Sequence, residues 1–508
     1  MASELLSVSI VAPGFAGLNT QDSSIALTKD YALRADNAVI DQFGRIAARQ
    51  GWVKVNTTSG FAGTEPTLIH EVIKIDGTTQ LVSIGDKKIF TGTTTLTQVY
   101  ADATWTASNW KAVNFNGHTY FFQRAHDPLV YDHALNTWTK VSAHPNYSGT
   151  VPLGNEVLAA YGRLWVADTT TDKTTVTWSD TLSGAKWSGG AAGSVNIENI
   201  LTNGTDSIVA LAAFNGYLII FCKTTIVIYS GADVDPAADL KLVEVIDGVG
   251  CIARDSVQDV GTDMFFLSDS GVKSLARVIQ EKSNPIIDIS RNVRDDLILA
   301  IAGNNDNSLI KAVYSQKQGF YLLSFPSLGL LYCFDLKTRL QDGVCKATLW
   351  TLTPKAFCSS VSRSLYFSRP GYIAEYSGYS DNESSYRFVY YSSYLDAGSA
   401  SLLKILKKIT LSVIGAGGTP VFLKWGVEYT QNYQSTLLPE LSLSARSEYN
   451  VAQYNISEYN SSNTSTNFIR SNIGGSGKVF QIGIEADILN DLLSVQQMDI
   501  YFKTGRTA

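Results

Sequence analysis

The chain has few charged residues, and it has neither paired cysteines nor a histidine-rich segment. Only 17% of its 508 residues are charged, against about 25% in an average soluble protein. The five cysteines are odd in number and form no C-x-x-C pair; they are Cys222, Cys251, Cys333, Cys345 and Cys358. This composition signals neither a disulfide framework nor a zinc site, so we expect reduced, buried thiols and no metal or other cofactor.

The sequence also lacks an excess of basic residues and any long apolar run. Its net charge of −6 and pI near 5.5 argue against a protein that binds nucleic acid by neutralising phosphates, because such binding requires clustered Lys and Arg. No apolar stretch reaches the roughly 18 residues that span a bilayer, so we expect no membrane insertion. The first residues lack the basic leader and apolar core of an export signal, and we expect a chain that folds in a reducing cytoplasm.

Strand patterns dominate residues 61–380, where a loosely repeated unit of about 40 to 55 residues recurs. In each unit a hydrophobic strand leads through a tight turn into a second, more aromatic strand, as in KAVNFNGHTYFF and ALAAFNGYLIIF. The turns of the successive units lie near Gly77, Gly117, Gly162, Gly216, Asp263, Gln318 and Arg363. This spacing is typical of four-stranded blades, so we predict an all-β chain with a β-propeller-like central domain. Unrelated β-sandwich hairpins are the alternative.

Two segments carry helical signals. In SRNVRDDLILAIAGNND, near residues 290–304, Asn292 is placed to cap a helix, Asp295 suits its first turn and Gly303 ends it. We interpret this segment as a helical insertion into the propeller. A second short helix is expected over residues 28–40, beginning at Thr28.

After about residue 380 the apolar residues alternate cleanly, as Ile409, Leu411 and Val413 do. This period of two predicts half-buried antiparallel strands, and hence a C-terminal β-sandwich over residues 381–508. A Tyr- and Asn-rich insertion at 429–475 interrupts it. Its tyrosines Tyr449, Tyr454 and Tyr459 recur every five residues, which fits neither helix nor strand. They either contact a partner such as the host surface or belong to a solvated loop.

No catalytic constellation stands out. The run GGSGKV resembles a phosphate loop only superficially, because Val479 stands where such a loop needs Ser or Thr. Propellers that cleave sugars need paired carboxylates on facing blades, and the sequence alone cannot pair its candidates, Asp168, Asp180, Asp263 and Asp269. We therefore expect a protein that is not an enzyme.

The segment DNAVIDQFGRIAARQGW, residues 36–52, combines carboxylates, a turn glycine and two arginines. Asp41 and Gly44 suit a turn in a strand pair, and Arg49 comes shortly before Trp52. Its guanidinium could stack on Trp52 or bridge to a neighbouring subunit. On either interpretation these charges have a structural role and hold the segment in place. The alternative is that they are solvated charges on a surface hairpin.

The wider stretch 17–52 resembles the N-terminal signature of the tail hub proteins of short-tailed bacteriophages, the nozzle or packaged-DNA stabilisation family. The residues that fall on this pattern are Asn37, Asp41, Gly44, Ile46, Arg49 and Gly51. The stretches AAFNGYLIIFCKTTIVIYSG, GVGCIARDSVQDVGTDMFFLSDSGVKSL and MDIYFKTGR are similar to the middle and the end of the family's sequences. The resemblance therefore touches the start, the middle and the end of the chain.

This resemblance implies a structural protein of the virion tail that is assembled in the bacterial host cytoplasm. It implies a homohexameric ring below the portal and its adaptor or connector, with attachment points for a tail fibre or spike. The double-stranded genome would leave through its channel without specific binding, and six copies would carry on the order of −36 charges (6 × −6), which repel phosphates. A propeller that binds or cleaves carbohydrate at the host surface is the alternative.

Within this interpretation, residues 1–60 form an N-terminal docking segment. The residues that we expect at the contacts with other subunits or the adaptor are Asn37, Asp41, Gly44, Arg45, Arg49 and Trp52. The family implies no catalytic residues.

Overall fold

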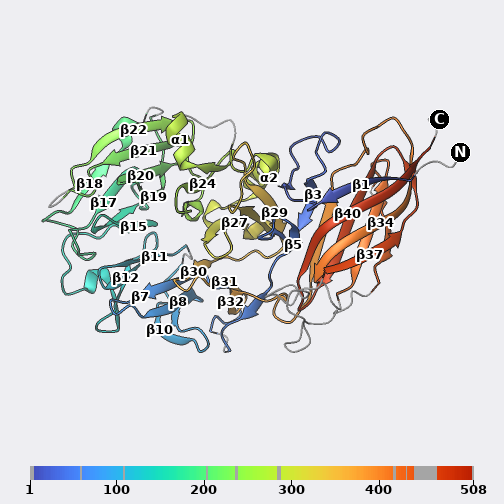
Figure 1. Cartoon of the computed structure of the whole chain (residues 1–508). Coiled ribbons are helices and arrows are strands. Elements are labelled where there is room, and N and C mark those ends of the chain that lie inside the picture. Colours follow the sequence, from blue (N-terminus) through green and yellow to red (C-terminus); the bar gives the residue numbers. More distant parts are fainter. Residues whose placement is uncertain are drawn as a thin grey trace, which may run out of the picture.

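The computed structural model describes residues 5–57, 60–106, 109–201, 204–234, 238–282, 288–415, 419–430, 432–439 and 466–505. It is almost entirely β-structure and consists of a β-propeller joined to a β-sandwich (Figure 1). This confirms the predicted fold class. Among the described residues, no helix is long and apolar enough to cross a membrane.

Six separate sheets form blades of the propeller, five with four strands and one with three. In chain order, the first blade consists of β7 (Leu68–Ile73), β8 (Thr79–Gly85), β9 (Lys88–Thr91) and β10 (Thr97–Ala101), and the second of β11 (Lys111–Phe115), β12 (His118–Phe122), β13 (Leu129–Asp132) and β14 (Thr137–Lys140). The third blade consists of β15 (Glu156–Ala160), β16 (Arg163–Ala167), β17 (Thr175–Trp178) and β18 (Gly193–Asn196). The fourth consists of β19 (Ile208–Phe214), β20 (Tyr217–Cys222), β21 (Thr225–Ser230) and β22 (Lys241–Asp247). The three-stranded blade has β23 (Gln258–Asp259), β24 (Met264–Ser268) and β25 (Gly271–Ser274).

The last separate blade is closed by the N-terminal part of the chain. It consists of β30 (Phe357–Ser359), β31 (Leu365–Arg369), β32 (Tyr372–Tyr376) and the early strand β6 (Trp52–Lys54). Between β23 and β30 lies a further meander, β26 (Lys311–Ser315), β27 (Phe320–Phe325), β28 (Leu330–Asp335) and β29 (Lys346–Trp350), which continues into a sheet of the sandwich. Each repeated unit predicted from the sequence coincides with one of these meanders.

Turn chemistry and face-to-face packing explain why this sequence forms blades. Asn116 and Gly117 in the β11–β12 turn, and Asn215 and Gly216 in the β19–β20 turn, all have positive φ, as tight two-residue hairpins require. One blade cannot bury both of its faces, so neighbouring blades share cores. One such core joins Trp165 and other side chains of β15–β18 to those of β19–β22.

Two helices lie beside the three-stranded blade, where α1 (Leu275–Glu281) contacts β24 and β25 and α2 (Arg294–Gly303) contacts β25. The helix α2 lies where the insertion was predicted and buries Leu297 and Ala300 in the core. The helix α1, capped by the Ser274 hydroxyl, was not predicted. The helix predicted at 28–40 is wrong, because this segment contains β3 (Tyr31–Asp36), which pairs with a C-terminal strand.

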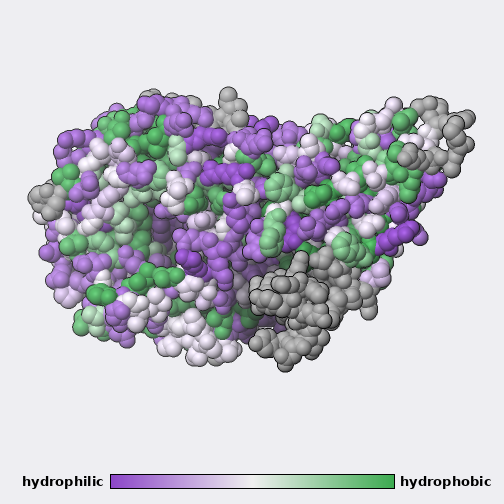
Figure 2. Space-filling view, in the orientation of Figure 1, coloured by the Kyte–Doolittle hydropathy of each residue, from purple (hydrophilic) through white to green (hydrophobic). Residues whose placement is uncertain are grey.

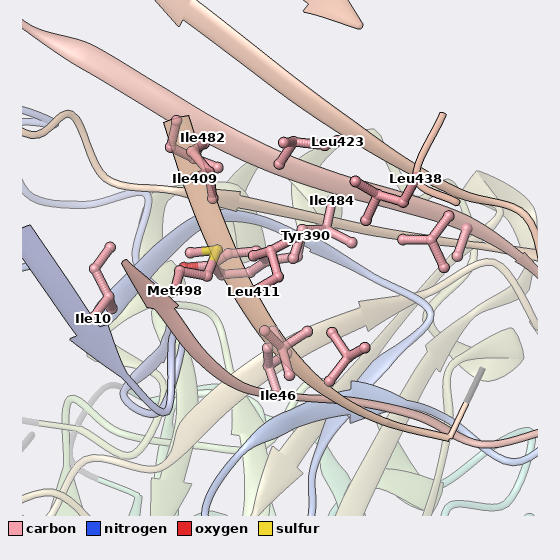
Figure 3. Packing of buried hydrophobic residues seen from close by; sticks show 14 of the residues in the cluster. Ile10, Ile46, Tyr390, Ile409, Leu411, Leu423, Leu438, Ile482, Ile484 and Met498 are labelled. Carbon is pink, nitrogen blue, oxygen red and sulfur yellow. The ribbon is translucent and has the colours of Figure 1, made fainter. Parts of the chain in front are cut away.

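The sandwich packs two large sheets against each other. One contains β1 (Leu6–Val11), β4 (Ala38–Ile40), β5 (Ile46–Ala48), β34 (Lys404–Gly415), β37 (Thr466–Asn472), β38 (Ser476–Gly477) and β40 (Leu493–Thr504). In the other, β26–β29 continue through β3 into β33 (Tyr386–Ser392), β39 (Phe480–Ile488), β35 (Val421–Val427) and β36 (Gln434–Leu437), with β2 (Gly17–Leu18) beside β3. Side chains from both sheets interdigitate between them (Figure 3).

The alternation predicted for the C-terminal part is confirmed, since Ile409, Leu411 and Val413 are all buried in this core. The described residues of the predicted N-terminal docking segment, 5–57 and 60, include strands that pair with distant parts of the chain, and the docking role of the segment stays a prediction. Strand β1 pairs along β40, and β5 also contacts β40, so the start of the chain completes the sandwich. Sequence patterns did not reveal this pairing because its partners lie more than 400 residues apart.

Candidate functional site at the junction of the two domains

The motif residues 37–52 lie where the sandwich meets the propeller. They leave β3 of the sandwich, form the β4–β5 hairpin and then enter β6, the closing strand of the last blade (Figure 1). One short segment therefore belongs to both domains, and its side chains decide how firmly the domains are joined.

Asn37 connects three separate parts of the chain. Its φ is +51°, in the left-handed region that asparagine tolerates better than most residues. Its Nδ2 donates to the Arg387 carbonyl at 2.7 Å, and its Oδ1 accepts from the Thr351 N–H at 3.0 Å and from Arg49 Nε at 3.0 Å. An amide suits this position because it donates and accepts at once.

Arg49 is fully buried at this junction. Its Nη1 and Nη2 each donate to one carboxylate oxygen of Asp381 at 2.8 Å, and its guanidinium carbon lies 4.1 Å from the centre of the Tyr386 ring. The Tyr386 hydroxyl donates to the Arg49 carbonyl. The side chain of Arg49 has 0% exposure and that of Asp381 22%. A planar, bidentate and stacked arrangement of this kind requires arginine rather than lysine.

The following residues allow the two domains to approach closely. A Cβ at Gly51 would lie 1.9 Å from the Ser380 carbonyl oxygen, so only glycine fits. The Trp52 N–H donates to that same carbonyl at 2.9 Å. The Trp52 ring does not stack on Arg49; it contacts Phe367 edge-on, and the guanidinium of Arg369 lies over it.

The Asp41–Arg45 turn is a second fastening within the sandwich. Asp41 accepts from the Phe43 and Arg45 N–H groups and pairs with the Arg45 guanidinium at 2.8 Å. Arg45 also donates to Gln496, and Ser494 donates to Asp41, so the turn is bound to β40. Gly44 has a φ of +76°, and a Cβ there would lie 2.8 Å from the Phe15 ring.

The burial of these side chains shows which of the predicted docking residues have surface that another subunit or the adaptor could contact. Arg49 has no exposed surface to offer a neighbouring subunit, and its contacts lie within its own chain. Asn37 is buried at 2% exposure and Trp52 at 9%. The exposed feature of the motif is the tip of the Asp41–Arg45 turn, where the side chain of Phe43 is 68% exposed. The predicted host-surface residues Tyr449, Tyr454 and Tyr459 lie outside the described residues.

A buried charge network, which sequence reasoning missed, crosses the axis of the propeller. Arg254 precedes β23 and reaches across the ring to the Asn109 and Asn155 carbonyls at 3.1 and 2.6 Å. Asp255 holds the Arg254 guanidinium with both oxygens at 2.8 Å and also binds Lys311 on β26. Hydrophilic residues gather in the middle of the propeller half (Figure 2). The one feature of the sequence that drew attention to Arg254 and Asp255 was the similarity of the stretch around them to the phage family.

The network also contains Glu156 on β15, which is fully buried. Lys111 lies 2.7 Å from its Oε1, and the Leu211 N–H donates to the same oxygen at 2.9 Å. Burial raises the pKa of Glu156. Burial also opposes ionisation of Asp255, but Arg254 and Lys311 outweigh it and hold the pKa of this carboxyl well below its usual value. Paired charges thus link the inner strands of several blades.

The carboxylates considered for sugar cleavage have local structural partners instead. Asp168 pairs with Arg124 and Lys173, and Asp180 accepts from the Thr181 and Ala191 N–H groups. Asp263 accepts from the Ser274 hydroxyl at the start of α1, and Asp269 accepts from the Ser268 hydroxyl. Within the described part of the chain, no group of three His, Cys, Asp or Glu side chains could hold a metal ion. All five cysteines are buried and free.

No family model and no curated protein matches the chain. Among solved structures it is similar to the extracellular domain of a one component system of B. thetaiotaomicron, with 10% identity, a TM-score of 0.41, and coverage of 66% of this chain and 41% of that one. PorZ, a surface component of the type-IX secretion system of Porphyromonas gingivalis, gives 12% identity, a TM-score of 0.37, and coverage of 64% and 37%. The chain thus spans less than half the length of either protein. Similarities at this level say nothing about activity or partners.

Proposed function

We propose that the chain is a structural, non-enzymatic protein of a short phage tail. Six copies form a ring-shaped nozzle that continues the DNA channel below the portal and adaptor, retains the packaged genome and lets it pass during ejection. The ring also offers attachment points for a tail fibre or spike. The chain is assembled in the cytoplasm of the bacterial host and works in the virion.

The observation that carries this proposal is the structural use of the motif 37–51. The positions that give the resemblance to the phage family include Asn37, Arg49 and Gly51, which join the two domains, and Asp41 and Gly44, which build the turn on β40. The part of the resemblance that lies in this motif therefore includes three residues, Asn37, Arg49 and Gly51, that hold one domain against the other. A subunit whose two domains are rigidly joined keeps the rotation at each interface constant, as a closed ring of identical subunits requires.

The charge network inside the propeller supports a particular arrangement of the channel. Since Arg254, Asp255 and Lys311 connect blades inside the propeller, we expect no passage for a duplex through a single subunit. The channel then lies on the symmetry axis of the ring, between copies. A ring of such copies is acidic overall, with −6 per copy, and this charge would favour sliding of the duplex over binding.

The test is the assembly state of the purified full chain, alone and mixed with the adaptor protein from the same virion. Negative-stain images and mass measurement should show rings of six copies, formed by the chain itself or on the adaptor. Antibodies against the chain should label the tail tip of virions. A chain that stays monomeric with the adaptor present, and that is absent from virions, would refute the proposal.

A further inference from the structure

We infer that neighbouring copies in the ring meet head to tail, with a basic face of the sandwich on one copy against an acidic edge of the propeller on the next. The inference rests on the proposed ring and assigns the two surfaces that close it. Opposite charge, exposed apolar side chains and the positions of the two surfaces in the molecule all lead to this pairing.

The basic sandwich face is the outer side of the sheet that contains β37, β34 and β40. On β34, Ile409 points into the core, so its neighbours Lys408 and Thr410 point outward. Arg470 on β37 lies opposite Thr410 in the register of the two strands. The cations of this face are Lys407, Lys408, Arg470 and Lys503.

In the described part of the chain, none of these four cations forms an ion pair. The Lys408 ammonium lies 4.1 Å from the centre of the Tyr501 ring. Asp499 supplies a carboxylate on this face and accepts from Gln497 Nε2 at 2.9 Å. The face therefore has an excess of positive charge in a chain whose net charge is −6, and its cations bind an outside carboxylate without giving up an existing pair.

The acidic blade edge is formed by β22, the outermost strand of the fourth blade. Residues 201–250, which contain this blade, include six Asp or Glu residues and two Lys residues, so their net charge is −4. Asp239 and Asp247 are exposed near the two ends of β22. Lys241 and Lys282 pair with carboxylates of this edge at 3.1 and 2.9 Å, but both lysines are at least 70% exposed. Such surface pairs contribute little, so the carboxylates remain available to a partner.

Each surface also has exposed apolar side chains among its charges. A β-bulge in β22 leaves Leu242 45% and Val243 50% exposed, and Phe468 on β37 is 79% exposed. Protein interfaces combine an apolar centre with a polar rim, so the two surfaces are alike in composition and opposite in charge. A nucleic acid would cover the basic sandwich face alone and leave the acidic blade edge without a partner.

The two surfaces lie at opposite ends of the molecule. Strand β22 is at the far edge of the propeller, whereas β34 and β37 are in the sandwich at the other end (Figure 1). They cannot meet within one copy, so a contact between them joins different copies. Head-to-tail contacts of this kind close into a ring when the rotation between copies allows it.

The experiment reverses the charge of each surface in the full-length chain. Lys407→Glu with Arg470→Glu reverses the basic sandwich face, and Asp239→Lys with Asp247→Lys reverses the acidic blade edge. Each double variant should assemble at least about tenfold more weakly than wild type, because like charges then face each other. Sedimentation measures assembly under the condition in which wild type forms rings, alone or on the adaptor. All four side chains are exposed, so the melting temperatures should not change.

The matched control is Lys317→Glu with Arg363→Glu. Both side chains are exposed in turns of the propeller, between β26 and β27 and between β30 and β31. This control changes the net charge by the same amount as reversal of the basic sandwich face, and it should leave assembly unchanged.

An equal mixture of the two reversed variants gives the sharpest test. The reversed face of one variant meets the reversed edge of the other, and their unaltered surfaces also match, so rings of alternating copies should form again. A ring of six closes with alternating copies because six is even. Recovery in the mixture cannot come from a general change in net charge or from misfolding of either variant.

The outcomes separate this inference from the proposed function. A wild-type chain that forms no ring with the adaptor present would refute the proposed function and the inference together. Wild-type rings with unchanged assembly of both reversed variants, or with no recovery in the mixture, would overturn the inference alone. If the wild-type chain bound duplex DNA and Lys407→Glu with Arg470→Glu abolished that binding without affecting the rings, the basic sandwich face would belong to the genome instead.

Discussion

At the scale of single residues, Arg49 shows how one buried cation joins two domains. We predict that Arg49→Ala lowers the free energy of unfolding by about 3 to 5 kcal/mol, because it leaves Asp381 without its bidentate partner in a largely buried site. Arg49→Lys should recover only part of this loss, since lysine cannot form the paired bonds or stack on Tyr386. Urea denaturation measures both variants.

The control for this prediction is Arg34→Ala. Arg34 is 58% exposed and pairs with Asp36 at the surface, so its loss should cost no more than about 1 kcal/mol. If Arg49→Ala were as mild as Arg34→Ala, the junction would not depend on the guanidinium. A further variant, Arg49→Glu, would place a negative charge beside Asp381 in this buried site. If it impaired tail assembly, the cause would be misfolding of the chain rather than the loss of a contact between subunits.

His70 gives the fold a dependence on pH. Burial lowers its pKa from 6.5 to about 4. Between these two pH values, therefore, the unfolded chain binds a proton at His70 that the folded chain does not. Stability should be fully present above pH 6.5 and should fall by up to about 3 kcal/mol as the pH drops toward 4. Denaturation midpoints at pH 7 and pH 5 should differ less in His70→Asn than in wild type. His126→Asn serves as the control, and an equal flattening there would contradict the assignment.

At the scale of elements, the closure of the last blade by β6 makes a prediction about local stability. Trp52 pairs with Tyr376 on β32 and is 9% exposed. Trp52→Ala should cost about 3 to 5 kcal/mol, and it should raise hydrogen exchange in β30–β32 before it does so in β15–β18, which lie elsewhere in the ring. Uniform loss of protection across both blades would show that the propeller does not open locally at this strand.

Local patterns in the sequence predicted the elements whose formation depends on neighbouring residues. Asn116-Gly117 and Asn215-Gly216 placed hairpins correctly because a positive φ is a local requirement, and alternation placed Ile409, Leu411 and Val413 in the core. The helix predicted over residues 28–40 is wrong, because β3 lies there and pairs with the distant strand β33. Arg254 could not be placed either, because its partners Asn109 and Asn155 precede it by about a hundred residues or more in the chain and meet it only once the ring closes.

At the scale of the whole molecule, the exposed tip of the Asp41–Arg45 turn tests where a ring would make its contacts. We predict that Phe43→Ser leaves the melting temperature of the monomer unchanged, since this side chain is 68% exposed, but lowers ring formation or adaptor binding about tenfold or more, as expected for an aromatic anchor. Leu135→Ser is the matched control, because Leu135 is 71% exposed in the β13–β14 turn of the propeller. Sedimentation of each variant with the adaptor measures assembly. If Phe43→Ser assembled like wild type, the N-terminal turn would not be the docking point; if Leu135→Ser failed instead, the propeller would carry the contact.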